Sequence, residues 1–224
     1  MKQRVIISRH LKTELAKAIA ECEHDRIFVL VDETTNKLCW SLVKDYLCLK
    51  DAQTIIIGAT DRRKNLDTLV HVWESLQQGK ATRHSLLINL GGGMVTDLGG
   101  FAASTYKRGI NFINIPTTLL AMVDASVGGK TGINFGGLKN EIGVFNDAEF
   151  VLLDTNWLRT LDEENIRSGY AEMLKHGLIA DDTMWAELIN FNLAQPNLRQ
   201  LASMLNKSVR IKERIVAEDP HEKG

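Results

Sequence analysis

Three consecutive glycines, Gly91–Gly93, stand between an apolar run at 85–90 and a stretch with helical spacing at 94–106. Glycines let the backbone turn tightly and approach a ligand closely, and the first N–H groups of a helix attract an anion. The pattern therefore predicts a phosphate-binding turn between a buried strand and a helix. Its glycines are consecutive, unlike those of G-x-G-x-x-G, and a tight turn without a ligand explains it equally well.

Two glycine-flanked segments that carry lysines follow. Asp124 opens the first, in which Lys130 comes after two glycines, and the second ends on Lys139 and Asn140. A lysine is a mobile cation that can reach a phosphate or a carboxylate. The Gly-Lys-Thr sequence ending at Thr131 is not a P-loop, because a P-loop needs glycine at position 124. We interpret both segments as loops that bring cations and an amide to an anionic ligand, with solvated surface loops as the alternative.

A helical stretch at 166–177 carries a third candidate cluster. Glu172, Lys175 and His176 are spaced i, i+3 and i+4, so they share one face of the helix. A Glu and a His four residues apart have the spacing of two metal ligands, although the H-E-x-x-H order is absent, and a surface ion pair is the alternative. Gly169 costs about 1 kcal/mol relative to alanine inside a helix, which predicts that another segment packs closely there.

Alternating strands and helices are expected to position these residues. The predicted strands are the β-branched apolar runs at 5–7, 27–31, 54–57, 86–90, 112–115 and 150–153, and helical patterns lie at 11–20, 35–47 and 66–76. This alternation predicts an α/β fold, with a Rossmann-like, mostly parallel sheet covered by helices on both faces. Asp32, Gly58, Gly91 and Thr117 all follow strand ends, so we expect them to gather at the ligand-binding edge of the sheet.

The pattern changes after Asp154, where no further strong β run occurs. Residues 160–163 have the form of a capping box, which predicts a helix beginning near Leu161, and Pro196 separates it from a helical pattern at 198–216. We predict an α/β domain at 1–159 and an α-helical domain at 160–224 that is incomplete. Thr117 or Thr118, after Pro116, is expected to cap the next helix or to contact a ligand.

The composition is that of an ordinary soluble protein. The 27 Lys and Arg residues nearly balance the 28 Asp and Glu residues, which excludes a nucleic-acid or membrane partner recognised by bulk charge. The N-terminus is too charged for a signal peptide, and no apolar run reaches transmembrane length. Three cysteines without a C-x-x-C pair indicate a reduced, cytoplasmic setting, in which each is a small buried residue.

Five motifs in order and register resemble those of the 3-dehydroquinate synthase family of sugar phosphate cyclases. They are 91–101, 116–118, 123–131, 138–140 and 169–175. The resemblance implies an NAD-dependent phosphorus–oxygen lyase that needs a divalent metal, zinc or cobalt. It would convert 3-deoxy-D-arabino-heptulosonate 7-phosphate, a sugar acid phosphate, to 3-dehydroquinate and phosphate in the shikimate pathway of aromatic amino-acid biosynthesis. A homodimer is the usual assembly that it implies.

The resemblance also implies roles for individual residues. Those for the substrate are Asp124, Lys130, Asn140 and Lys175, with Glu172 as a metal ligand. Those for NAD are Asp32, Asp61, Lys64, Gly92, Gly93, Met94, Val95, Thr96, Asp97, Thr117, Thr118, Lys130, Lys139, Leu158 and Thr160. His176 is expected to be only a neighbour of the metal ligand.

One part of the family pattern is missing. The family supplies two histidine metal ligands and an arginine–asparagine pair from a region that would follow Lys223. A single carboxylate does not complete a zinc site, so we expect the 224-residue chain alone to bind metal poorly and to have little activity. The alternatives are another cyclase of the 2-deoxy-scyllo-inosose or valiolone synthase type, an iron-type alcohol dehydrogenase, and a non-catalytic NAD-binding module.

Overall fold

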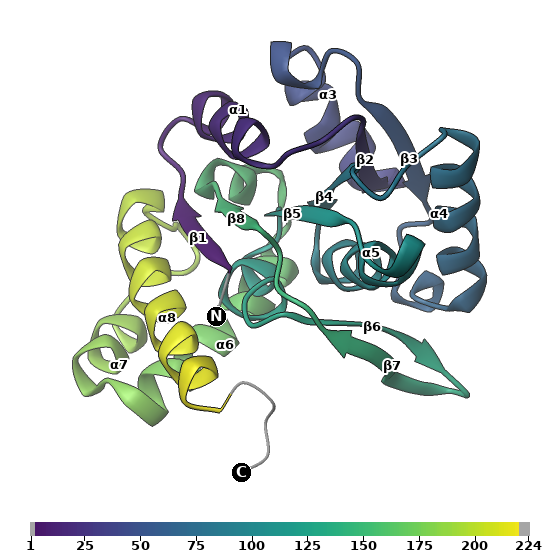
Figure 1. The fold of residues 1–224 in the computed structure, drawn as a ribbon. Coiled ribbons are helices and arrows are strands. Elements are labelled where there is room, and N and C mark those ends of the chain that lie inside the picture. The colour runs from purple at the N-terminus through teal and green to yellow at the C-terminus, as the bar shows by residue number, and fades with distance from the viewer. Residues whose placement is uncertain (1–2, 220–224) are drawn as a thin grey trace.

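A six-stranded parallel sheet forms the centre of the molecule (Figure 1), which a computed structural model describes over residues 3–219. The strand order is β1-β8-β5-β4-β2-β3. The strands are β1 (Arg4–Ile7), β2 (Ile27–Asp32), β3 (Gln53–Ile57), β4 (Leu86–Gly91), β5 (Asn111–Pro116) and β8 (Phe150–Leu153). All six coincide with predicted apolar runs, so the predicted α/β sheet is confirmed. The last residues of the predicted 160–224 domain lie outside the described part.

Helices cover the sheet because its central strands are apolar on both faces. Every residue of β4 is buried, as are the last five residues of β5. Helix α5 packs on β4 and β5, and α1 packs on β8. The helices of this part are α1 (Leu11–Glu21), α2 (Glu33–Thr35), α3 (Ser41–Val43), α4 (Leu66–Gln78) and α5 (Gly93–Thr105). The short 3-10 helices are η2 (Leu47–Leu49), η3 (Asp61–Arg63), η4 (Tyr106–Arg108) and η6 (Thr155–Thr160).

The predicted helix at 35–47 is interrupted. A π-helical turn, η1 (Asn36–Trp40), lies between α2 and α3, and the helical run ends at Val43. The wider turn buries the side chains of Cys39 and Trp40. All three cysteines are free thiols. Cys22 is also buried, as predicted, but Cys48 is partly exposed, so the prediction that each cysteine is buried is wrong for Cys48.

The two glycine-flanked lysine segments were predicted to be loops, and that prediction is wrong. They form an antiparallel hairpin of β6 (Lys130–Phe135) and β7 (Leu138–Phe145), which extends from the body of the molecule (Figure 1). All eight residues of β7 are exposed, so the segment lacks the apolar alternation that identifies a strand in a sequence. Gly136 and Gly137 have positive φ values and make the turn.

Three helices follow the sheet and pack on one another: α6 (Glu163–Ala180), α7 (Asp182–Ile189) and α8 (Leu198–Glu218). Helix α6 begins later than predicted, since Asp162 and not Thr160 is its N-cap and accepts a hydrogen bond from the Asn165 N–H at 2.8 Å. Among residues 3–219, no helix is both long enough and apolar enough to cross a membrane.

Candidate active site

The triple-glycine turn is a corner without side chains at the C-terminal edge of the sheet. Strand β4 ends at Gly91, Gly92 is the N-cap of α5, and the helix begins at Gly93. A Cβ on Gly91 would lie 2.5 Å from a Val95 methyl carbon, and a Cβ on Gly92 would lie 3.1 Å from the Thr118 methyl carbon. Side chains at these two positions would crowd Val95 and Thr118, so glycine keeps the backbone of the corner accessible to a ligand.

Hydrogen bonds inside this turn determine which of its N–H groups are available to a ligand. The N–H groups of Val95 and Thr96 both donate to the carbonyl of Gly92, and their side chains are buried. The first N–H groups of an α-helix have no acceptor inside the helix, which leaves Gly93 and Met94 as the donors that can face an anion. Within the predicted cofactor set, Val95 and Thr96 thus shape the turn, while Gly92, Gly93 and Met94 line it.

Asp32 lies at the end of the neighbouring strand β2, where one of its oxygens is already used. Its Oδ1 accepts hydrogen bonds from the N–H groups of Thr34 at 2.7 Å and Thr35 at 2.8 Å, so it caps α2. Oδ2 is the oxygen available for a ribose hydroxyl. The edge of the sheet continues into the turn after β5, where Thr118 Oγ1 accepts from the Ala121 N–H at 3.2 Å, as its predicted capping role requires.

Cys39 brings two predicted cofactor residues together. Burial raises the pKa of its thiol to about 11, and the nearby hydroxyls of Thr160 and Thr117 oppose this shift. The thiol is therefore protonated at neutral pH. Leu158, the other predicted residue of η6, is buried in the core beside this group.

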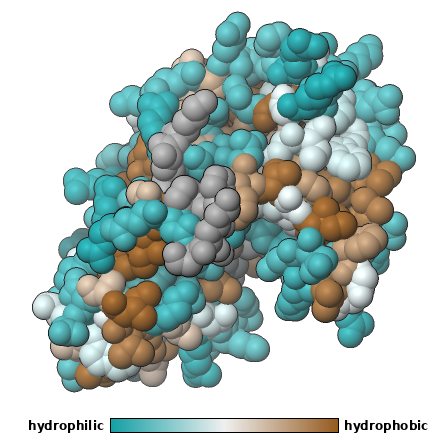
Figure 2. Space-filling view, turned by 60° about the horizontal axis from the view of Figure 1, so that its bottom comes forward, coloured by the Kyte–Doolittle hydropathy of each residue, from teal (hydrophilic) through white to brown (hydrophobic). Residues whose placement is uncertain are grey.

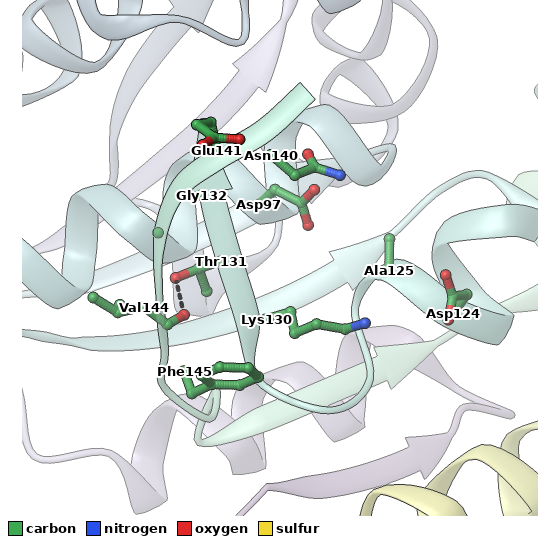
Figure 3. A pocket seen from close by; sticks show the side chains of 11 residues that line it. Asp97, Asp124, Ala125, Lys130, Thr131, Gly132, Asn140, Glu141, Val144 and Phe145 are labelled. Carbon is green, nitrogen blue, oxygen red and sulfur yellow. Dashed lines mark hydrogen bonds between the residues drawn. The ribbon is translucent and has the colours of Figure 1, made fainter. Parts of the chain in front are cut away.

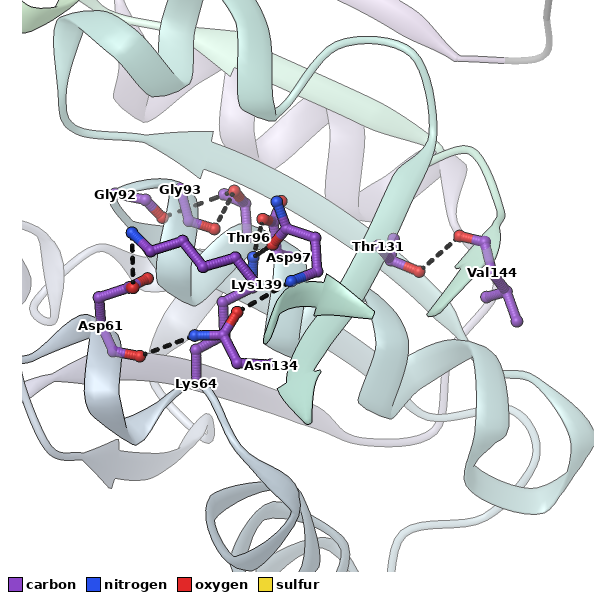
Figure 4. Close-up of polar contacts among 11 residues, drawn as sticks. Asp61, Lys64, Gly92, Gly93, Thr96, Asp97, Thr131, Asn134, Lys139 and Val144 are labelled. Atoms are coloured by element: carbon purple, nitrogen blue, oxygen red, sulfur yellow. Dashed lines mark hydrogen bonds and ion pairs between the residues drawn. The ribbon is translucent and has the colours of Figure 1, made fainter. Parts of the chain in front are cut away.

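Lys64 is a buried cation that joins three segments (Figure 4). Its side chain is 5% exposed, forms an ion pair with Asp97 of α5, and donates to Asn140 Oδ1 of β7 at 2.5 Å. Nearby, the exposed Lys139 pairs with Asp61 at 3.1 Å. The structure thus brings together five predicted site residues: Asp61, Lys64, Asp97 and Lys139 for the cofactor, and Asn140 for the substrate.

A cavity of about 400 Å³ opens beside this cluster, between α5, the hairpin and the turn that carries Asp124 (Figure 3). Asp97, Asp124, Lys130 and Asn140 line it. Burial raises the pKa of Asp97 above its ordinary value, and the nearby charge of Lys64 opposes that shift. A carboxylate with a raised pKa, next to two cations in a concave site, is typical of a functional site.

Asp124 lies in a second π-helical turn, η5 (Ala121–Ala125), and faces several lysines. Burial alone would raise its pKa, but a hydrogen bond and the charge of Lys212 lower it below the ordinary value. The charges of Lys175 and Lys130 add to this effect. Lys212 Nζ lies 2.7 Å from Asp124 Oδ1. These lysines come from β6, α6 and α8, so segments far apart in the sequence converge on one carboxylate.

Sequence reasoning missed Lys212. It lies on the buried stripe of α8, next to Ile211 and one turn after Ser208 and Val209, and is itself only 8% exposed. A lysine within an apolar helical stripe is the one signal that could have identified it, because a buried ammonium group needs a partner.

Glu172 and Lys175 form an ion pair on α6, which was the alternative to metal ligation at Glu172. His176, expected to be only a neighbour, is buried, and its Nε2 lies 3.5 Å from Glu172 Oε1. Its Nδ1 is 2.7 Å from Ser208 Oγ of α8. Burial lowers the pKa of His176, although the charge of Glu172 opposes this, so the ring is neutral at pH 7.

The described residues do not provide a complete metal site. Glu172 offers a carboxylate oxygen, which suits a divalent cation, but residues 3–219 contain no group of three or more His, Cys, Asp or Glu side chains that could hold a metal. The triple-glycine corner, in contrast, fits the pyrophosphate of a dinucleotide.

Known proteins resemble this chain over its whole length. The 3-dehydroquinate synthase N-terminal family model matches residues 54–168, and the corresponding C-terminal model matches residues 169–224. The 3-dehydroquinate synthase of Parabacteroides distasonis is 49% identical over 223 residues, which cover 100% of this chain and 63% of that protein. The enzyme of Pyrococcus furiosus is 42% identical over 199 residues, which cover 89% of this chain and 58% of that protein. The chain thus spans about three fifths of the length of these relatives.

Solved structures of sugar phosphate cyclases share the fold. A 2-epi-5-epi-valiolone synthase from Streptomyces hygroscopicus subsp. jinggangensis, with NAD+ and Zn2+ bound, superposes with a TM-score of 0.87 at 30% identity, over 99% of this chain and 63% of that chain. A 2-deoxy-scyllo-inosose synthase, in complex with carbaglucose-6-phosphate, NAD+ and Co2+, gives a TM-score of 0.86 at 25% identity, over 99% and 62% of the two chains. The two family models and the identity to curated relatives show that this chain belongs to the 3-dehydroquinate synthase family.

Proposed function

We propose that this chain is the NAD-binding part, with the beginning of the α-helical part, of a 3-dehydroquinate synthase. The enzyme would convert 3-deoxy-D-arabino-heptulosonate 7-phosphate to 3-dehydroquinate and inorganic phosphate; the Parabacteroides distasonis relative is named 3-dehydroquinate synthase. The observation that carries the proposal is that Asp124 pairs with Lys212 at 2.7 Å and lines one cavity with Lys130, beside the glycine corner. A sugar acid phosphate carries a carboxylate and a phosphate, so it needs such a set of cations.

The proposed cofactor is NAD, as in the two cyclase structures. Gly92, Gly93 and Met94 would hold its pyrophosphate, and Asp32 would accept hydrogen bonds from the adenosine ribose. When bound, NAD would accept a hydride from the substrate and return it later in the cycle. Lys64, Asp97 and the remaining predicted cofactor residues would belong to the same NAD site.

The lysines and Asp124 would divide the work on the substrate. Lys130, Lys175 and Lys212 would neutralise its carboxylate and its leaving phosphate, which lowers the barrier to phosphate departure. Asp124, held ionised by these cations, would accept a hydrogen bond from a substrate hydroxyl and orient the sugar ring. Asn140 would add an amide from the hairpin side of the cavity.

We further propose that Glu172 is one ligand of a divalent metal, zinc or cobalt, as in the metal-bound neighbours. A cation at Glu172 would polarise the hydroxyl that is oxidised. Because residues 3–219 hold no complete ligand set, other ligands would have to join Glu172. The division into an α/β domain at 1–159 and an α-helical domain from 160 onward is part of the same proposal.

A homodimer in the cytoplasm is the proposed assembly and location. The homodimer is supported by the hairpin, on which Phe135, Leu138 and Phe145 are 50%, 60% and 50% exposed. Figure 2 shows apolar surface on this side of the molecule. A second copy covering this surface would remove it from water. Sedimentation of the wild-type chain and of Leu138→Lys should distinguish a dimer that the variant breaks from a chain that is monomeric in both forms.

The function is tested with a chimera in which this chain replaces the matching 63% of the Parabacteroides distasonis relative. We expect the chimera to release inorganic phosphate from the heptulosonate phosphate only when NAD and a divalent metal are present, without accumulation of NADH. The 224-residue chain alone should bind NAD but release little phosphate.

Each alternative predicts a different result. Accumulating NADH would indicate an alcohol dehydrogenase, and turnover of another sugar phosphate in place of the heptulosonate phosphate would indicate another cyclase. NAD binding without turnover, alongside an active parent relative, would indicate a non-catalytic module. Any of these results would overturn the proposal.

A further inference from the structure

Asn134, on strand β6 of the hairpin, has no role in the site described so far. It lies between the segment 61–64 and strand β7 (Figure 4). Its backbone N–H donates to the carbonyl of Lys64 at 2.8 Å. Its side-chain Nδ2 donates to the carbonyl of Asp61 at 3.2 Å, and its Oδ1 accepts from the Asn140 N–H at 3.0 Å. One residue thus joins the segment 61–64 to both strands of the hairpin.

The contact with Asn140 holds the backbone of that residue. Asn140 has φ of 55°, in the left-handed region that asparagine tolerates better than most residues. Its N–H is held by Asn134 Oδ1, while its own Oδ1 accepts from Lys64 Nζ at 2.5 Å. The backbone and the side chain of Asn140 are therefore fixed from opposite sides, by Asn134 and by Lys64.

The contacts with Asp61 and Lys64 hold the second half of the cluster. Lys64 reaches Asp97 of α5 and Asn140 of β7 from a main chain that is itself bound to Asn134. Without the Asn134 side chain, the contacts described between the hairpin and this segment would be the backbone bond from the Asn134 N–H to the Lys64 carbonyl, the Lys64 side chain and the exposed Lys139–Asp61 pair. An exposed ion pair contributes little, so Asn134 is the main fixed link.

We propose that Asn134 is a positioning residue that aligns Lys64 and Asn140 in the active site. This proposal rests on the proposed function, because Lys64 is assigned there to the NAD site and Asn140 to the substrate. The side chain of Asn134 is bonded to Asp61 and Asn140. It acts by holding the segment 61–64 against β7, so that Lys64 stays between Asp97 and Asn140.

The first test measures amide hydrogen exchange of Asn140 in the 224-residue chain, which needs no ligand. We expect Asn134→Ala to speed exchange at Asn140, and Asn134→Asp, which keeps an oxygen acceptor, to preserve its protection. Asn146→Ala is the matched control, since it removes the hydrogen bond from Asn146 Nδ2 to Ser104 Oγ at the base of the hairpin. Unchanged exchange in Asn134→Ala, or equal loss in the control, would overturn the proposal.

The second test is a double-mutant cycle on NAD affinity, measured by calorimetry. Asn134→Ala should weaken NAD binding by about tenfold, the effect of one well-placed hydrogen bond to a charged site. In a Lys64→Met background, the same change should have an effect of less than about twofold, because Asn134 acts through Lys64. Asn146→Ala should leave the affinity unchanged. A merely structural role predicts additive losses, and additivity would overturn the proposal.

The experiments distinguish a failure of the positioning role of Asn134 from a failure of the proposed function. If the chimera releases phosphate but the cycle is additive, only the positioning role of Asn134 is wrong. If the chimera fails as described above, the proposed function is wrong, and the role of Asn134 is overturned with it.

Discussion

Lys212 Nζ lies 2.7 Å from Asp124 Oδ1, and this contact joins the last described helix to the π-helical turn beside the glycine corner. The Lys212 side chain is 11% exposed and that of Asp124 is 33% exposed, so the pair is largely removed from water. The contact therefore ties the α-helical part of the chain to the edge of the parallel sheet. It also keeps a carboxylate ionised at the point where an anionic substrate is proposed to bind.

The first prediction concerns the stability contributed by this pair. Lys212→Met should lower the free energy of unfolding by about 1–2 kcal/mol at pH 7, because the partly buried Asp124 loses its charged donor. Urea unfolding followed by circular dichroism measures this. Lys207→Met, which removes a half-exposed ion pair with Glu187 of α7, is the control and should cost less than about 1 kcal/mol. Equal losses in both variants would contradict the role of the pair.

The second prediction is the pH dependence of that contribution. The pKa of Asp124 is lowered in the folded chain, so the stability gained from its ionisation is present above its unfolded pKa and is lost as the pH falls through the folded value. The difference in unfolding free energy between wild type and Lys212→Met should therefore shrink below about pH 4. Urea titrations between pH 7 and pH 3 measure it, and a difference that grows toward acid would contradict the sign.

The third prediction concerns close packing at Gly169. A Cβ at this position would lie 2.4 Å from the backbone N of Leu120 and 2.6 Å from the carbonyl carbon of Leu119. Gly169→Ala should therefore destabilise the chain by about 1–3 kcal/mol, although alanine favours a helix by about 1 kcal/mol.

Ser168→Ala, at the exposed neighbouring position, serves as the control for Gly169→Ala and should be neutral or slightly stabilising. Residues 119–120 lead directly into the turn that carries Asp124, so the alanine would also displace that turn. Thermal unfolding of both variants measures the change in stability that each substitution causes. A stabilised Gly169→Ala chain would show that α6 does not approach this segment as closely as described.

The fourth prediction separates the two uses of Asp32. Asp32→Ala removes both the cap of α2 and the proposed ribose contact, so it should cost about 1 kcal/mol of stability and weaken NAD binding at least about tenfold. Asp32→Asn keeps an oxygen that accepts from Thr34 and Thr35, so most of the stability should remain while NAD affinity still falls. Calorimetry with NAD and urea unfolding on the same samples measure both. Full NAD affinity in Asp32→Asn would exclude the ribose role.

The predictability of each element follows from its burial. The strands of the parallel sheet are apolar runs because both of their faces are covered, so the sequence pattern predicts them directly. The hairpin of β6 and β7 has exposed residues and turn glycines instead, and resembles a pair of loops. Asp162 and Thr160 were both available as a cap for α6, and the backbone of η6 decided between them.

Local spacing and glycine geometry in the sequence are enough to predict the parallel sheet, the glycine corner at Gly91–Gly93 and the residues that end its strands. The close approach at Gly169 was also predictable, since a glycine in a helix needs a reason. Only the tertiary structure brought Lys212 to Asp124, Asn134 to Asn140 and Ser208 to His176. Each of these pairs joins separate elements, and the packing of whole helices and strands sets such distances.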